Sequence, residues 1–317
     1  MKWKKLGKIF DPTEHMLPNN CREFSQSPQV LLFDDFIRIY FSTRERDRSG
    51  KFLSHIAFVD FDKKISKVLN ISSATVLPLG KPGCYDEHGI FPLNVLRDGD
   101  KVLGYISGWS RRVSVSVETA IGLAVSRDNG LTFHRIGDGP LLASSLYEPF
   151  LVGDPFVRFG GGEYHMWYIY GLRWIRQTKE DMAERVYKIG HARSLDGVVW
   201  KKTGRQLITD RLDQNECQAL PTVIDINGGY HMYFCYRRAV NFRKSRDGAY
   251  RLGYAFSTDM VNWVRDDRLA GIDVSEDGWD SDMMCYPHVF RCGDEIYMLY
   301  NGNEFGRFGF GLAVLEK

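Results

Sequence analysis

Short apolar segments that each begin at a proline recur along the chain. They begin at Pro28, Pro92, Pro155, Pro221 and Pro287, which are 64, 63, 66 and 66 residues apart. Because self-similarity at a fixed period is the signature of a repeat architecture, each proline marks one structural unit.

An aromatic-rich segment follows each proline segment after a polar or glycine-containing turn. The five segments read FIRIYFSTR, KVLGYISGW, EYHMWYIYG, GYHMYFCYR and EIYMLYNGN. Within them Met166, Met232 and Met298 are 66 residues apart, which matches the last two proline intervals. Two elements therefore repeat in phase.

A third strand with a GxAxS-like centre comes next in most units. It reads IGLAVS, IGHARS, LGYAFS and, in shortened form, FGLAV. In three units it leads into a turn and a fourth strand, as in SRDNGLTF, where Asp and Gly provide the side-chain hydrogen bonds and positive φ that hairpins need.

Four antiparallel strands repeated five times at about 65 residues predict an all-β, five-bladed β-propeller that spans residues 1–317 as a single domain. The last unit ends after three strands. We expect residues 2–10 to pair with 308–316 as the fourth strand of the last blade, which would remove an exposed sheet edge. Only residues 178–185 have a helical pattern.

Composition and charge narrow the functional classes. The chain is 44% hydrophobic, 26% charged and 14% aromatic, with 31 glycines, and its formal net charge is +2. Such a balance argues against a nucleic-acid partner. The N-terminus has no apolar signal-peptide run and no 18 apolar residues are consecutive, so we expect a cytoplasmic protein without membrane insertion.

The six cysteines form no CxxC pair and no zinc-ligand spacing. We interpret them as reduced thiols, most of them buried in the core. We expect neither a metal nor a cofactor.

Propeller geometry predicts where a site would form. Residues just before each repeated proline and just after each aromatic strand should gather at one axial mouth. Four blades supply a carboxylate before the proline, and these are our candidate catalytic residues: Glu87, Asp154, Glu216 and Asp282.

Arginine recurs after the aromatic strands. Several convergent guanidinium groups suit a carboxylate or a phosphate, so we expect such an anion at one or more of Arg44, Arg111, Arg173 and Arg237. The candidate substrate-binding residues are Arg44, His88, Trp109, Arg111, Arg173, Arg237, Tyr286, His288 and Asn301. The alternative is that the acids and arginines of this ring simply neutralise one another.

Two segments, GDPFVRFGGGEYHMWY (153–168) and NECQALPTV (215–223), resemble the five-bladed propeller glycosidases, the arabinanase, xylosidase, invertase and levansucrase group. The resemblance implies that Asp154 stabilises the transition state and that Glu216 is the acid. The family's aspartate in the first blade is replaced by serine and glutamine at 25–27, so Asp11, Glu87 or Asp282 would have to supply the second carboxylate.

Two weaker resemblances remain. The chain is similar to the propeller domain of plant glucosamine inositolphosphorylceramide transferase, which keeps sugar transfer open. The turn SRDNGLTF resembles the Asp box of sialidases, but we interpret it as structural because it lies on an outer hairpin.

Three functions follow from this pattern. The first is a glycosidase for an anionic or phosphorylated sugar, because glycoside cleavage needs one carboxylic acid at the leaving oxygen and one carboxylate opposite it. The second is a transferase or phosphorylase that uses a sugar nucleotide or sugar phosphate. The third is a non-catalytic propeller that binds a glycan.

Overall fold

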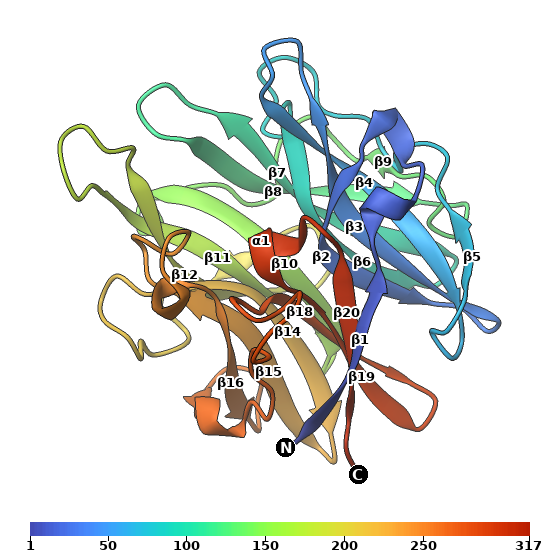
Figure 1. Ribbon diagram of the computed structural model, residues 1–317. Helices are drawn as coiled ribbons and strands as arrows, with labels where there is room; N and C mark the ends of the chain where they lie inside the picture. The colour runs from blue at the N-terminus through green and yellow to red at the C-terminus, as the bar shows by residue number, and fades with distance from the viewer.

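The computed structural model describes residues 1–317, and its regular secondary structure is almost entirely β-strand (Figure 1). Blade 1 contains β2 (Glu23–Leu32), β3 (Phe36–Arg46), β4 (Phe52–Asp62) and β5 (Val68–Ile71). Blade 2 contains β6 (Gly89–Asp98), β7 (Lys101–Arg111), β8 (Val117–Ser126) and β9 (His134–Arg135). A single parallel bridge, Ser54 to Gly89, links these two four-stranded units.

The next three blades repeat the same antiparallel order. Blade 3 contains β10 (Phe150–Gly160), β11 (Glu163–Ile175), β12 (Glu184–Ser194) and β13 (Lys201–Lys202). Blade 4 contains β14 (Cys217–Ile226), β15 (Gly229–Arg237), β16 (Arg251–Ser257) and β17 (Val264–Arg265). Blade 5 contains β18 (Cys285–Cys292), β19 (Glu295–Asn301), β20 (Phe310–Leu315) and β1 (Trp3–Phe10).

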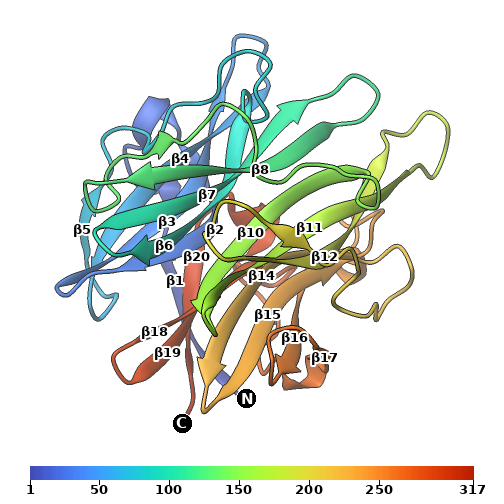
Figure 2. The same ribbon diagram turned by 180° about the vertical axis from the view of Figure 1, so that it is seen from behind.

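The innermost strands β2, β6, β10, β14 and β18 contact one another in a closed ring. Figure 2 shows the blades following one another around this centre. Apolar side chains fill the spaces between neighbouring blades, for example Phe41 and Ile39 of blade 1 against Phe290 and Phe310 of blade 5. The predicted five-bladed β-propeller is confirmed.

The predicted closure of the last blade is also confirmed. Strand β1 pairs antiparallel with β20 from Trp3 opposite Leu315 to Phe10 opposite Phe310. The two termini therefore lie in the same sheet, and Figure 1 shows them side by side.

The predicted helix at 178–185 is wrong. Residues 177–181 form bends, and the β11–β12 ladder reaches Ile175 opposite Glu184, so Glu184 and Arg185 begin a strand. Helical structure is confined to the short α1 (Asn303–Gly306) and four 3₁₀ turns, η1 (Pro12–Glu14), η2 (Pro18–Asn20), η3 (Arg246–Gly248) and η4 (Asp267–Leu269). No helix is long and apolar enough to cross a membrane.

Every innermost strand has a bulge at its repeated proline. The register skips the proline and the residue before it in all five strands. A proline has no N–H for the ladder, so a bulge is where a strand interior tolerates it. The preceding residue has a left-handed φ in four blades, at Ser27, Asp154, Leu220 and Tyr286. In blade 2 the Phe91–Pro92 peptide is cis.

Candidate active site

Two adjoining cavities open at the axis, with volumes of about 370 and 450 Å³. The first lies against blades 1 to 5 and the second against blades 1, 3, 4 and 5. The residues common to both walls are Arg44, Phe52, Arg185, Tyr187, Arg243, Tyr250 and Tyr286. The two cavities are therefore compartments of one site, and we refer to them as the first and second compartments.

Three bulge residues reach the first compartment. Phe91, Asp154 and Tyr286 occupy the position before the proline in blades 2, 3 and 5, and all three line it. The rings of Phe91 and Tyr286 meet edge to face with their centroids 5.1 Å apart. The repeated bulge thus turns side chains out of the strand alternation and toward the axis.

Asp154 is the buried acid of this site. Its side chain lines the first compartment although the residue is only 7% exposed. Burial raises the pKa of its carboxyl to about 7, and Arg185 and the backbone amide of Leu220 partly oppose that rise. A carboxyl with such a pKa is present in both protonation states near neutral pH and suits general acid–base chemistry.

Arg44 and Arg185 stand beside this acid without partners. Neither guanidinium donates a hydrogen bond or forms an ion pair within the protein, and the Arg44 Nε is buried. Arg44 stacks on Phe24, with its guanidinium carbon 4.4 Å from the ring centroid. Burial lowers the pKa of Arg44, and the nearby charges of Arg185 and Arg243 lower it further. A cluster of uncompensated positive charge therefore borders both compartments.

Five of the thirteen predicted site residues line the two compartments. The first compartment has Arg44, Trp109, Asp154 and Tyr286 in its wall, and the second has Arg44, Arg237 and Tyr286. Arg237 is only 2% exposed and stacks on Phe242 at 3.5 Å. The site therefore contains one predicted carboxylate instead of four.

Glu216 does not lie in this site, and its predicted position at the axial mouth is wrong. The residue is 0% exposed, and both carboxylate oxygens are occupied. Oε2 accepts from the backbone amides of Arg211 and Leu212 at 3.0 and 2.9 Å, while Oε1 accepts from Arg265 at 2.6 Å. No acceptor site remains for a substrate.

The Glu216–Arg265 pair is one of four equivalent pairs. In each, an acid from the loop before the innermost strand meets a base from the outermost strand: Asp86–Arg135, Glu148–Lys202, Glu216–Arg265 and Asp280–Lys5. Each base lies directly across the ladder from the alanine of the GxAxS-like strand: Ala124, Ala192, Ala255 and Ala313. The acid before the proline is thus a repeated structural feature of the blades.

The other two predicted carboxylates also lie elsewhere. Glu87 accepts from the Gly83 amide at 2.6 Å and sits 3.2 Å from His88 Nδ1. Asp282 is exposed, and its backbone amide donates to Asn303. Asp11, a further candidate, caps a 3₁₀ turn and forms an ion pair with Lys8. All three lie outside both compartments.

Two predicted arginines are held away from the site by neighbouring groups. Arg111 forms an ion pair with Asp47 at 2.7 Å and also donates to the Phe52 carbonyl. Arg173 donates to the Asn215 side chain and the Gln214 carbonyl. Neither arginine lines the two compartments, because groups of nearby loops satisfy their donors.

The remaining predicted residues support the fold. His288 accepts from the Val30 amide at 3.2 Å, and burial lowers its pKa to about 3. Asn301 donates to the Ser25 and Gly309 carbonyls and accepts from the Ser27 amide. His88 lies beside Glu87 and stacks near Trp109 without lining either compartment.

Sequence reasoning missed a group of wall residues from the third strands and their loops: Phe52, Glu184, Arg185, Tyr187, Arg243 and Tyr250. A signal for them existed. In an antiparallel blade the third strand begins where the second ends, so its first residues face the same mouth. Glu184 and Arg185, which begin β12, follow this rule.

No three His, Cys, Asp or Glu side chains lie together as metal ligands.

The hydrogen bonds agree with the predicted structural role of the Asp-Gly turns. Ser126, Ser194 and Ser257 each donate to the aspartate two residues later.

The five-bladed propeller fold of this chain is similar to that of several solved glycoside hydrolases and phosphorylases. It superposes on BT0996 in its complex with RGII with a TM-score of 0.73 and 17% identity, over 99% of this chain and 91% of that protein. β-1,2-Mannobiose phosphorylase from Listeria innocua superposes with a TM-score of 0.68 and 13% identity, over 99% of this chain and 96% of that chain. An endo-arabinase from Bacteroides thetaiotaomicron VPI-5482 superposes with a TM-score of 0.63 and 13% identity, over 98% of each chain.

The chain belongs to the same family as two proteins of Mycobacterium tuberculosis, named Uncharacterized protein MT1551 (strain CDC 1551 / Oshkosh) and Uncharacterized protein Rv1502 (strain H37Rv). Each is 37% identical to it over 318 residues, which cover 100% of both chains. No protein-family model matches the sequence.

Proposed function

We propose that residues 1–317 form one domain whose axial site cleaves or transfers a glycosyl group of an anionic sugar. The observation that carries this proposal is Asp154, a buried carboxyl with a pKa of about 7 that lines a cavity beside unpartnered arginines. Such an acid protonates a leaving glycosidic oxygen as the bond to the sugar carbon breaks.

Hydrolysis also needs a group that activates water on the other side of the sugar ring. Glu184 is the second carboxylate in the first compartment, and it is paired with Arg243 at 2.9 Å. We assign it the role of the opposing base, for which the sequence offered Asp11, Glu87 and Asp282 as candidates. Trp109 and the Phe91–Tyr286 pair offer apolar faces for the ring of the sugar.

Transfer to phosphate is a second candidate function, favoured by the unpartnered Arg44 and Arg185. In that reaction a phosphate oxygen attacks the sugar carbon, so a second carboxylate is not required. Asp154 would still protonate the leaving oxygen. Likeness of fold to a mannobiose phosphorylase is compatible with this candidate.

The test is turnover by Asp154→Asn on a panel of oligosaccharides and sugar phosphates, with and without added inorganic phosphate. We expect a loss of about 10²- to 10⁴-fold with binding retained, because the amide keeps the shape of the acid. Asp282→Asn makes the same change on an exposed loop outside the site and should leave turnover unchanged.

Each outcome of that panel separates the candidates. Loss of turnover in Glu184→Gln supports hydrolysis, whereas turnover that needs phosphate and survives Glu184→Gln supports transfer to phosphate. Full turnover by Asp154→Asn contradicts the assignment of the acid. A wild-type protein that binds glycans and turns none over is a binding propeller.

A further inference from the structure

The charge of the second compartment is far from balanced. Its wall contains six arginines and two glutamates. Both glutamates, Glu23 and Glu304, pair with the same arginine, Arg307, at 2.6 and 3.0 Å. No carboxylate pairs with Arg44, Arg185 or Arg237. One carboxylate from a ligand would leave most of this charge uncompensated, whereas a phosphate or diphosphate matches it.

The arginines of this compartment are held in fixed planes. Arg237 lies over Phe242 at 3.5 Å and donates to the carbonyls of Arg238 and Ala239, while its buried Nε has no partner. Arg243 lies over the same ring at 4.1 Å, and its Nη1 is already paired with Glu184. Stacking fixes a guanidinium plane, and the N–H groups without a partner, such as the Arg237 Nε, are then oriented to bind phosphate oxygens.

The compartment is desolvated as well as positive. Burial and the like charges of Arg185 and Arg243 lower the pKa of Arg44. Like charges held together out of water are unfavourable unless an anion joins them. The geometry and the charge therefore both indicate a polyanion between Arg44, Arg185 and Arg237.

We propose that the second compartment binds a phosphate or diphosphate group that is covalently attached to the glycosyl substrate, whose sugar ring lies in the first compartment against Asp154. This inference rests on the proposed function, because it divides one substrate between the two compartments. Arg44 and Arg185 line both, so they mark the junction between sugar and phosphate.

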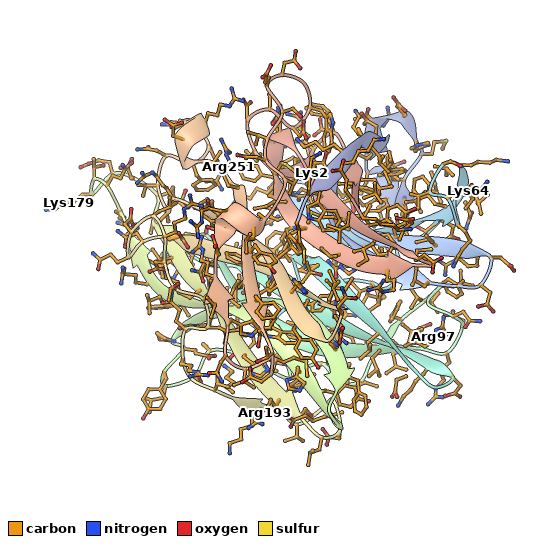
Figure 3. All side chains as sticks on the ribbon, turned by 90° about the horizontal axis from the view of Figure 1, so that it is seen from below. Lys2, Lys64, Arg97, Lys179, Arg193 and Arg251 are labelled. Atoms are coloured by element: carbon orange, nitrogen blue, oxygen red, sulfur yellow. The ribbon has the colours of Figure 1, made fainter.

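The experiment measures equilibrium binding by calorimetry at constant ionic strength, with inorganic phosphate, pyrophosphate and glucose 1-phosphate as probes. The variants are Arg44→Gln, Arg185→Gln and Arg237→Gln. Arg193→Gln is the control, because Arg193 pairs with Glu163 and Figure 3 shows it at the periphery of the molecule. Near-ultraviolet circular dichroism checks that the variant of the buried Arg237 is folded. Arg185 is only half-buried, so its variant tests the site even if Arg237→Gln does not fold.

We expect pyrophosphate or glucose 1-phosphate to bind the wild type more tightly than inorganic phosphate. Loss of one charge-assisted contact should weaken binding on the order of 10- to 100-fold in Arg44→Gln and Arg185→Gln, and Arg193→Gln should bind like the wild type. Equal affinity for inorganic phosphate and glucose 1-phosphate would overturn covalent attachment and identify free phosphate as the ligand. No binding of any probe, or equal binding by all variants, would overturn the phosphate site.

Phosphate binding can be measured without turnover. The binding test of the arginines and the turnover test of Asp154 can therefore fail independently of each other. Asp154→Asn should retain phosphate binding, since the substitution removes a negative charge and leaves the arginines in place. A turnover defect in Asp154→Asn without any phosphate binding would leave the proposed function standing and remove the phosphate site.

Discussion

Arg265 Nη1 lies 2.6 Å from Glu216 Oε1, and the two side chains are 5% and 0% exposed. The pair connects the outermost strand of blade 4 to the loop before its innermost strand, and so ties the two edges of the blade together. Asp267 also pairs with Arg265, at 2.9 Å. A glutamate held in this way stabilises a blade and has no free oxygen for chemistry.

Removal of either partner should therefore affect folding. Arg265→Ala leaves the buried Glu216 without a positive partner, which costs about 3 to 5 kcal/mol in free energy of unfolding. Glu216→Ala should cost less, because Arg265 keeps its pair with Asp267. Urea unfolding of both single variants and the double variant measures the coupling between them. The exposed pair Arg268–Asp266, three residues farther on, provides the control, and Arg268→Ala should change stability little. A Glu216→Gln protein with intact stability and no turnover would restore Glu216 as a catalytic candidate.

The architecture was predictable because its signals are local. The proline of each innermost strand sits in a bulge of the same strand, and each Asp turn bonds within its own hairpin, so neither depends on distant residues. Asp154 was predictable for the same reason, since it immediately precedes Pro155.

Glu216 could not be separated from a catalytic acid by sequence alone. It lies just before an innermost strand, where propeller geometry predicts a site residue, and the partner that occupies it, Arg265, lies 49 residues farther along the chain. Arg111 and Arg173 were misplaced similarly, because Asp47 and Asn215 reach them from other loops. Only the fold shows which polar groups already have partners.

The closure of the propeller should depend on the N-terminal strand. Trp3 is buried, and its Nε1 donates to the Tyr233 hydroxyl at 3.1 Å, which joins blade 5 to blade 4. Trp3→Ala should lower the free energy of unfolding by about 3 to 5 kcal/mol through the cavity that it leaves. Thermal denaturation compared with Lys4→Ala, an exposed neighbour on the same strand, tests this. Equal melting temperatures for the two variants would contradict it.

The raised pKa of Asp154 should make stability depend on pH. The folded pKa is about 7 and the ordinary value is near 3.8, so the folded state binds the proton more tightly and stability falls as pH rises toward 7. Asp154→Asn removes this dependence. The difference in free energy of unfolding, variant minus wild type, should increase by about 1.4 kcal/mol per pH unit between pH 5 and 7. Above pH 7 this difference should become constant.

Urea denaturation of the two proteins from pH 5 to 8 measures this gain. The comparison with pH 5 cancels any constant effect of the amide on packing. A difference that stays constant from pH 5 to 8 would mean that Asp154 is ionised throughout this range and cannot serve as a proton donor near neutral pH.

The last prediction concerns Arg185, whose positive charge opposes the effect of burial on Asp154. Arg185→Gln removes that charge, so the protonated carboxyl is favoured further and the pKa of Asp154 should rise above 7, by on the order of one unit. The stability difference between Arg185→Gln and the double variant Arg185→Gln/Asp154→Asn should then level off at a higher pH than in the wild-type background. Arg193→Gln serves as the background control because it changes the same net charge at the periphery (Figure 3). If the pH above which the stability difference is constant were unchanged or lower in the Arg185→Gln background, Arg185 would not act on Asp154. A shift equal to that in the Arg193→Gln background would attribute the effect to net charge instead of to the contact at the site.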